Sequence, residues 1–346
     1  MSKPSFEIVK QVYTIMSGVQ RSKALEVCTK LRIAEHIAPE SSKSVGDLSK
    51  ELKVHEDTLY RFMRALTSMS LFQEEEITDT NKTHGIFKHT PMSLCLRDQG
   101  VRDMVLMRGS PGQVLSWNGL FNSVKTGRTN HQESLNYPDL WEYLKDHKEE
   151  EVLFSKAMTG VTNMFVPVLL SFSDYSKFEK VVDLGGGQGL LLKNILANYP
   201  NIKEGINFDI KSVIENNSHG ENLDKRYTDQ SGDFFVSVPE SDCYVLKSII
   251  HDWNDECAVN IFKTISKSIR PGGKIYVYDL INDLNLKNEK NQAGWNDIHM
   301  LMVCNGKERT PQDWEYLAKH SGFKIDEIRR HSTIPNTLGL TIFSKI

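Results

Sequence analysis

One histidine and two carboxylates in the second half of the chain could form an acid–base site. His251 lies just after a predicted strand, and Asp279 lies at the end of the next one. Glu308 lies just before a helix predicted at 311–321, with Thr310 as its N-cap and Asp313 at N3. A histidine can serve as a general base at neutral pH, and a carboxylate on one ring nitrogen would orient it. The alternatives are a structural histidine and, at Glu308, a charge that complements the helix dipole.

A glycine-rich turn joins the first predicted strand of this region to its helix. The sequence Asp-Leu-Gly-Gly-Gly-Gln-Gly at 183–189 lets the backbone turn sharply and approach a ligand without a Cβ in the way. Open α/β sheets bind ligands at this end of their strands. Leu190 stands where the dinucleotide motif GxGxxG has its third glycine, which disfavours NAD. A plain tight connection between strand and helix is the alternative.

Three further residues at strand ends favour an adenosine ligand. Asp209 ends the second predicted strand, where its carboxylate could accept hydrogen bonds from both ribose hydroxyls. Asp233 and Phe234 follow the third strand and suit the exocyclic amine and the ring of an adenine. Taken singly, Asp209 could be a helix N-cap and Phe234 a core residue.

The elements that must position these residues alternate between strands and helices from about residue 173. This alternation predicts an α/β fold with a Rossmann-like, doubly wound, mostly parallel seven-stranded sheet. The last two strands have no helix between them and are expected to pair antiparallel. A turn at 271–273 is expected to lead into the fifth strand. The predicted strands lie at 180–184, 205–208, within 227–235, and at 242–249, 274–280, 323–328 and 338–343.

The first 150 residues are predicted to be mainly helical, with two helices in 44–71 and a small hairpin in 72–88. This is a winged-helix-like arrangement. Its candidate recognition helix carries Arg61 and Arg64 beside two acidic residues, which is a poor surface for binding phosphates. A dimerising or structural role is therefore expected in place of DNA binding. The predicted domains are 1–172, helical and dimerising, and 173–346, ligand-binding and catalytic.

Composition limits the remaining classes of function. The chain has 346 residues and a formal net charge of −3, which argues against nucleic acid as a partner. We find no apolar run near the ~18 residues of a membrane span and no signal peptide. The five cysteines form no CxxC pair, so neither a disulfide framework nor a metal site is expected. A cytoplasmic globular protein is predicted.

Together, the motifs resemble those of class I S-adenosylmethionine-dependent methyltransferases. They look most like the plant caffeate/flavonoid-type and animal acetylserotonin-type O-methyltransferases, and the resemblance covers nearly the whole chain. The motifs that carry it are Asp-Leu-Gly-Gly-Gly at 183–187, Gly-Asp-Phe-Phe at 232–235, His-Asp-Trp-Asn-Asp-Glu at 251–256 and Gly-Lys-Glu-Arg-Thr at 306–310.

The resemblance implies a homodimer with interlocked N-terminal helices, S-adenosylmethionine as methyl donor and S-adenosylhomocysteine as product. It implies His251 as the base, flanked by Asp279 and Glu308. Plant members usually carry Glu where Asp279 stands. Because Asp is one methylene shorter, Glu308 could carry the orienting role alone. The residues expected to form the donor site are Asp183, Gly185, Gly187, Asp209, Asp233, Phe234 and Lys247.

The expected acceptor is a small, flat aromatic compound that bears a hydroxyl group. The residues expected to line its pocket are Met107, Phe154, Met158, Trp253, Trp295 and Met300, although Phe154 and Met158 could be ordinary core. The expected reaction is a metal-independent SN2 displacement in which His251 takes the proton of the acceptor. The alternatives are an N-methyltransferase acting on a small amine, a donor-binding regulator without catalysis, and a winged-helix DNA-binding protein.

Overall fold

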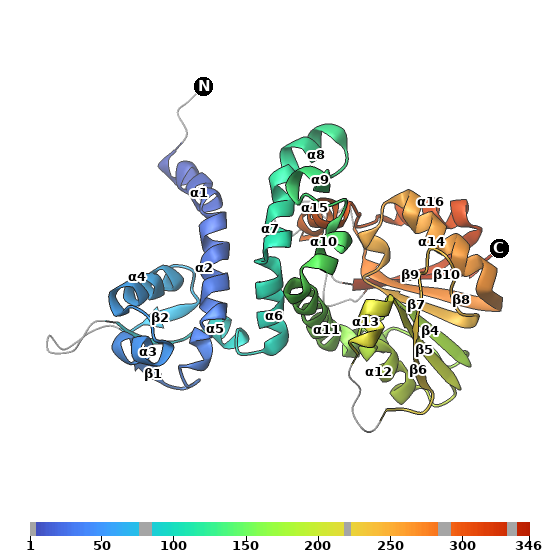
Figure 1. The fold of residues 1–346 in the computed structure, drawn as a ribbon, viewed down its shortest axis with the longest axis horizontal. Coiled ribbons are helices and arrows are strands. Elements are labelled where there is room, and N and C mark those ends of the chain that lie inside the picture. The colour runs from blue at the N-terminus through green and yellow to red at the C-terminus, as the bar shows by residue number, and fades with distance from the viewer. Residues whose placement is uncertain (1–4, 76–84, 218–222, 283–291, 331–337) are drawn as a thin grey trace. The chain divides into compact units, whose positions relative to one another are not determined.

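The computed structural model describes residues 5–75, 85–217, 223–282, 292–330 and 338–346. The chain forms two compact units, which divide between Pro111 and Gly112 (Figure 1). The packing boundary therefore lies earlier than the predicted boundary between residues 172 and 173, and residues 112–172 pack with the sheet.

The first unit confirms the predicted pair of helices followed by a hairpin. Strands β2 and β3 form the antiparallel hairpin, and the sheet has the order β1-β3-β2. Strand β1 was not predicted, because its Ser-Lys-Ser sequence carries no apolar alternation. Leu48, Met63 and Phe87 are fully buried in the core of this unit. Its elements are α1 Phe6–Met16, α2 Gly18–Lys30, η1 Ile33–Glu35, β1 Ser42–Ser44, α3 Val45–Leu52, α4 Glu56–Thr67, β2 Phe72–Glu74, β3 Ile86–His89, α5 Pro91–Cys95 and α6 Gln99–Arg108.

The second unit begins with a helical segment that packs on the sheet. Its helices are α7 Pro111–Ser116, η2 Trp117–Gly119, α8 Leu120–Thr126, α9 His131–Ser134, α10 Leu140–Asp146 and α11 Lys148–Ser171. Val166 and Leu169 of α11 are buried in one cluster with Leu192 and Ile195 of the sheet region. This burial explains why residues 112–172 do not separate from the sheet. Helix α11 is the one described helix long and apolar enough to span a membrane by length and composition, a test that core helices also pass.

The sheet has seven strands in the order β6-β5-β4-β7-β8-β10-β9. Strands β4 to β8 pair in parallel, and β10 pairs antiparallel with both β8 and β9. The predicted doubly wound topology is confirmed. The elements are β4 Lys180–Leu184, α12 Leu190–Asn198, β5 Glu204–Asp209, α13 Lys211–Glu215, β6 Tyr227–Ser231, β7 Ser241–Lys247, η3 Ile250–Asp252, α14 Asp255–Ser268, β8 Ile269–Leu280, α15 Gln292–Cys304, α16 Pro311–Ser321, β9 Phe323–Arg329 and β10 Leu338–Lys345.

Both faces of the sheet are covered, because successive side chains of a strand point to opposite faces. On β7, Cys243 and Val245 join the cluster that includes residues of α11 and α12. Tyr244 and Leu246 join the cluster that includes residues of α14 and α16. The two layers hold the strands rigidly, so the loops at their carboxyl ends have fixed starting points.

The start of β8 and the end of β7 differ from the prediction in ways that bear on the site. Strand β8 begins at Ile269, before the predicted turn, and residues 270–273 bulge out because Ser241 pairs with Ile269 while Cys243 pairs with Lys274. Strand β7 ends at Lys247 instead of residue 249. Ser248 adopts a positive φ of 55°, which ends the extended conformation and turns the chain into η3. This turn places His251 beside the carboxyl edge of the sheet.

Candidate active site

His251 and Glu308 form a buried pair. The ring Nδ1 of His251 lies 3.0 Å from Oε1 of Glu308, whose side chain is only 3% exposed. The backbone N–H of Glu308 donates to Oδ1 of Asp297 on α15 at 2.9 Å. With Nδ1 held by a carboxylate, Nε2 is the nitrogen that remains to take a proton from a ligand.

Asp279 holds the main chain of the histidine and not its ring. Its Oδ2 accepts from the backbone N–H of His251 at 3.0 Å. Glu308, and not Asp279, is therefore the carboxylate that contacts Nδ1 of His251. The side chain of Asp279 is 2% exposed and lies on the penultimate residue of β8.

Asp252 is a further carboxylate near the ring and was not among the predicted site residues. Its Oδ1 lies 3.5 Å from Nε2 of His251. Burial alone lowers the pKa of His251, but Glu308, Asp279 and Asp252 together raise it to about 10. Burial raises the pKa of Asp252 to about 6, although His251 opposes this. The position of Asp252 directly after the histidine in the His-Asp-Trp motif is the feature of the sequence that could have indicated it.

The loop before α16 brings Glu308 to the histidine. Thr310 caps α16 in a capping box with Asp313, as predicted, which fixes the entry of the helix. The backbone N–H of Lys307 donates to the carbonyl of His251 at 2.8 Å. A Cβ at Gly306 would lie 2.0 Å from that same carbonyl oxygen, so only glycine allows the two loops to approach this closely.

The predicted donor loop lies between β4 and α12. Gly185 and Gly187 adopt positive φ angles of 73° and 57°, as the tight turn requires. A Cβ at Gly185 would lie 2.3 Å from Cδ1 of Ile249, so the turn also packs against the segment that leads to His251. Oδ2 of Asp209 accepts from the backbone N–H of Gly187 at 2.9 Å. Asp209 therefore fixes the loop, and its oxygens retain lone pairs for a further donor.

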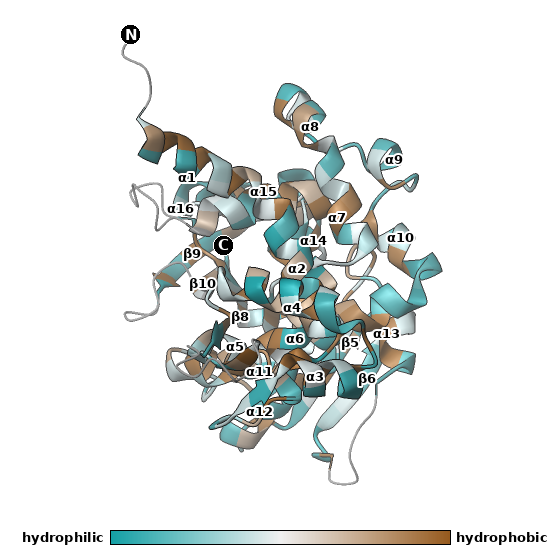
Figure 2. Ribbon diagram, turned by 90° about the vertical axis from the view of Figure 1, so that its left-hand side faces the viewer, coloured by the Kyte–Doolittle hydropathy of each residue, from teal (hydrophilic) through white to brown (hydrophobic). Residues whose placement is uncertain are grey.

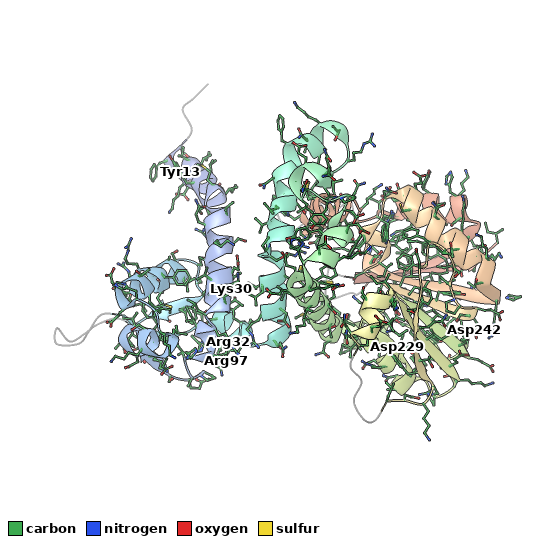
Figure 3. The ribbon with its side chains drawn as sticks, viewed as in Figure 1. Tyr13, Lys30, Arg32, Arg97, Asp229 and Asp242 are labelled. Carbon is green, nitrogen blue, oxygen red and sulfur yellow. The ribbon has the colours of Figure 1, made fainter. Side chains whose placement is uncertain are left out.

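A polar network beneath this loop was not predicted. Nδ2 of Asn207 donates to the carbonyl of Gly187 at 2.9 Å and to Oδ1 of Asp229 at 2.8 Å. The hydroxyl of Tyr227 donates to the same Asp229 oxygen at 2.8 Å. Asp229 is labelled in Figure 3 on strand β6. The hydroxyl lies so near Gly189 that a Cβ there would approach it to 1.9 Å. Three side chains on two adjacent strands thus support the loop.

Asp183 on β4 and Lys247 at the end of β7 lie on adjacent strands of the sheet. Asp183 is 2% exposed, and burial raises its pKa to about 7 although the Lys247 cation opposes the shift. Burial likewise lowers the pKa of Lys247, whose Nζ donates to Oγ of Ser248 at 3.2 Å. A Cβ at Gly186 would lie 2.8 Å from Oδ2 of Asp183. Asp183 therefore packs directly against the donor loop.

An aromatic row connects residues predicted for the two sites. The ring centroids of Phe234 and Trp253 are 6.2 Å apart, and those of Trp253 and Trp141 are 6.3 Å apart. Trp141, which was not predicted, lies 5.7 Å from Phe154. Asp233 is exposed, and its Oδ1 accepts from the backbone N–H of Phe235 at 2.8 Å. Trp253 and Trp141 thus connect Phe234, a predicted donor residue, to Phe154, a predicted acceptor residue.

The other residues predicted to line the acceptor pocket lie in several different places and not in one row. Met300 is 9% exposed and belongs to a cluster against which Phe154 packs. Met158 is half-buried on α11, whereas Trp295 on α15 is 68% exposed. Met107 is buried in the first unit. In the described ranges, no group of three or more His, Cys, Asp or Glu side chains is arranged to hold a metal ion.

Comparison with known proteins defines the class. Residues 117–324 match an O-methyltransferase domain, and residues 13–98 match an O-methyltransferase dimerisation domain. The chain therefore belongs to the family of S-adenosylmethionine-dependent O-methyltransferases that carry a dimerisation domain, which includes plant and animal members.

Relatives align over almost their full lengths. Des-methyl DIF-1 methyltransferase A of Dictyostelium discoideum is 34% identical, over 90% of this chain and 87% of its own. Phenazine O-methyltransferase PhzM of Lysobacter antibioticus is 29% identical, over 95% and 93%. The crystal structure of LaPhzM matches with a TM-score of 0.85 at 27% identity, over 98% and 99%. Human N-acetylserotonin methyltransferase in complex with SAM shares the fold, with a TM-score of 0.86 at 22% identity over 100% and 99%.

Proposed function

We propose that this protein transfers the methyl group of S-adenosylmethionine to a hydroxyl group of a small aromatic compound, with His251 as general base. The observation that carries the proposal is the contact of 3.0 Å between Nδ1 of His251 and Oε1 of Glu308, which leaves Nε2 to accept a proton. The relatives support the acceptor class, since they include a phenazine and a coclaurine O-methyltransferase. A related crystal structure holds 1,4-dihydroxy-2-naphthoic acid.

The reaction follows from this geometry. The sulfonium of the bound donor supplies an electrophilic methyl group. Nε2 of His251 takes the proton of the acceptor hydroxyl while the hydroxyl oxygen bonds to the methyl carbon. The bond between that carbon and the sulfur breaks at the same time, and S-adenosylhomocysteine leaves. Glu308 stabilises the imidazolium that forms. Because His251 acts as the proton acceptor, the proposed step uses no metal ion. The chief contribution of the protein is the alignment of the two reactants.

We assign the donor site to the edge formed by the glycine loop and the ends of β5, β6 and β7. Asp209 would accept from the ribose hydroxyls while it holds Gly187. Asp233 and Phe234 would contact the adenine, and Lys247 and Asp183 would support the floor beneath the loop. This assignment keeps the predicted donor residues together at one end of the parallel strands.

We assign the acceptor pocket to the aromatic row and the cluster beside it. Trp253, Phe154 and Met300 offer flat or adaptable apolar surfaces that suit an aromatic ring. Trp141 joins this assignment because it contacts both Trp253 and Phe154. Met107, Met158 and Trp295 remain predictions of the sequence.

We propose a cytoplasmic homodimer formed through the dimerisation domain. Helix α1 presents large apolar side chains to solvent, among them Phe6 at 84% and Ile15 at 79% exposed, and Figure 2 shows it mostly brown. An exposed apolar patch of this kind marks a protein interface. All five cysteines are free thiols, which suits a reducing compartment.

The test is a transfer assay with the purified protein and donor labelled in its methyl group. Incubation with a panel of phenols should yield labelled, base-stable methyl ethers, whereas matched amines should stay unlabelled. Labelled amines and unlabelled phenols would identify an N-methyltransferase. One Dictyostelium relative at 32% identity is named a probable inactive O-methyltransferase. Donor binding by calorimetry without transfer to either panel would therefore contradict the proposed function and favour a regulator.

A further inference from the structure

Arg309 is a buried cation next to the proposed active site, and the reaction does not use it directly. Its side chain is 0% exposed, and it makes four hydrogen bonds. Nη1 donates to the carbonyl of Ile250 at 2.7 Å, and Nη2 donates to the carbonyl of Trp253 at 2.8 Å. Nε and Nη2 donate to Oδ1 of Asp255 at 3.1 and 2.9 Å.

The partners of Arg309 lie on both sides of His251. The carbonyl of Ile250 precedes the histidine, and the carbonyl of Trp253 follows it by two residues. Asp255 begins α14, which packs against α16, the helix that follows Arg309 (Figure 1). The guanidinium therefore holds the short segment that carries the proposed base and ties it to the start of the next helix.

The residues beside Arg309 contact the same histidine. Glu308 bonds to its ring, and the backbone N–H of Lys307 donates to its carbonyl at 2.8 Å. The carbonyl of Arg309 itself accepts from the backbone N–H of Asn282 at 3.0 Å, two residues after β8. Lys307, Glu308 and Arg309 thus all bond to the segment around His251, so the loop that carries the Glu308 carboxylate is held against that segment.

We propose that Arg309 is a positioning residue that fixes the distance between His251 and Glu308. The proposal rests on the proposed function, in which His251 is the base. A guanidinium is a planar fork that donates in several fixed directions at once, whereas the ammonium of lysine is a compact point charge on a flexible stem. Lysine at this position would keep the positive charge but could not bridge both carbonyls and Asp255 together.

The chain offers a matched control at Arg226. Its guanidinium donates to the carbonyls of Ile202 and Leu196 at 2.9 and 2.6 Å and pairs with Asp224. Arg226 precedes β6, so it lies at the opposite edge of the sheet from the carboxyl ends of the strands. Arg226→Lys therefore removes the same kind of bridge without touching the proposed site.

The experiment compares Arg309→Lys with Arg226→Lys in the full chain. One readout is kcat on a phenol that the wild type methylates, and the other is the NMR titration of the His251 ring, which needs no turnover. We expect Arg309→Lys to lower kcat on the order of 10- to 100-fold. We also expect the pKa of His251 to fall toward its ordinary value as Glu308 moves away. The donor affinity of both variants and the kcat of Arg226→Lys should match the wild type.

Four outcomes would overturn or redirect these conclusions. The positioning role would be overturned if Arg309→Lys had the kcat and the His251 titration of the wild type. Equal losses of kcat in Arg309→Lys and Arg226→Lys would overturn it as well. If Arg309→Lys does not fold, Asp255→Ala removes the side-chain oxygen to which Nε and Nη2 of Arg309 donate. An unchanged titration of His251 in that variant would overturn the role equally. If no phenol is methylated by the wild type but the titration moves in Arg309→Lys alone, the positioning role stands and the proposed function fails.

Discussion

Three carboxylates surround His251 and set its charge. Glu308 touches Nδ1, Asp252 lies near Nε2, and Asp279 holds the backbone, so the pKa of the ring is raised to about 10 although burial opposes this. Only the neutral ring can accept a proton. Because the raised pKa keeps the ring protonated at neutral pH, we expect kcat/KM to rise with pH above neutrality in a pH–rate profile. A rate that falls over that range would contradict this assignment.

Glu308→Gln separates charge from geometry. The amide can still contact Nδ1, but the loss of the anion lowers the pKa of His251. We expect the rising limb of the pH–rate profile to move to lower pH, while the maximal rate falls about 100-fold or more because the imidazolium loses its counter-charge. Glu179→Gln, which changes an exposed ion pair with Lys203, is the control and should leave the profile unchanged. If the rising limb of the pH–rate profile does not move in Glu308→Gln, Glu308 does not set the pKa of His251.

Gly306 tests how closely the two loops approach. A Cβ there would lie 2.0 Å from the carbonyl oxygen of His251, which is backbone and cannot rotate away. We expect Gly306→Ala to lower the free energy of unfolding by about 1–3 kcal/mol, measured in urea, and to lower kcat. A Cβ at Gly18 would meet nothing within 4 Å, so Gly18→Ala should have little effect. Equal unfolding free energies for both variants would show that the loops can separate freely.

At the scale of elements, adjacent strands β5 and β6 support the donor loop. Tyr227→Phe removes the hydroxyl that donates to Asp229 beneath Gly187 and Gly189. We expect donor affinity, measured by calorimetry, to weaken about fivefold, while kcat at saturating donor stays unchanged. Tyr244→Phe is the matched control, since its buried hydroxyl donates to the carbonyl of Pro239 in another part of the sheet. Each variant should lose about 1 kcal/mol of stability, and equal donor affinities would refute the supporting role of the network.

The elements that the sequence predicts best are those specified locally. Strand β4 and helix α16 have the predicted bounds, because the apolar run and the Thr310 cap act within a few residues. The early end of β7 depends on a positive φ at Ser248, which no local pattern of side chains signals. The network of Asn207, Asp229 and Tyr227 joins two strands, and such contacts follow from register and not from spacing along the chain.

Contacts between distant segments also explain which features of the site could not be predicted from the sequence. Residue types and strand ends point to His251, Glu308 and Asp279, which the structure places in contact. They did not reveal that Asp279 contacts the backbone, because this depends on how far β8 extends beside η3. Trp141 was missed for a similar reason, since it reaches Trp253 from a helix about a hundred residues earlier in the chain.

At the scale of the whole molecule, measuring the oligomeric state tests the proposed homodimer directly. Ile15 and Val19 are each 79% exposed on consecutive helices α1 and α2. We expect the wild type to sediment as a dimer and Ile15→Asp with Val19→Asp to sediment as a monomer, because a charge is costly in an apolar interface. Val236→Asp, at a 72% exposed residue of the sheet unit, should remain dimeric. A monomeric wild type would contradict the proposed homodimer.

The central claim is that His251 is the base that deprotonates the acceptor. The most direct measurement is single-turnover transfer of labelled methyl by His251→Ala, with donor affinity determined by calorimetry on the same preparation. Loss of a general base lowers a rate on the order of 100- to 10,000-fold, so we predict a fall in this range with donor affinity within about twofold of the wild type. A rate equal to that of the wild type would contradict the claim.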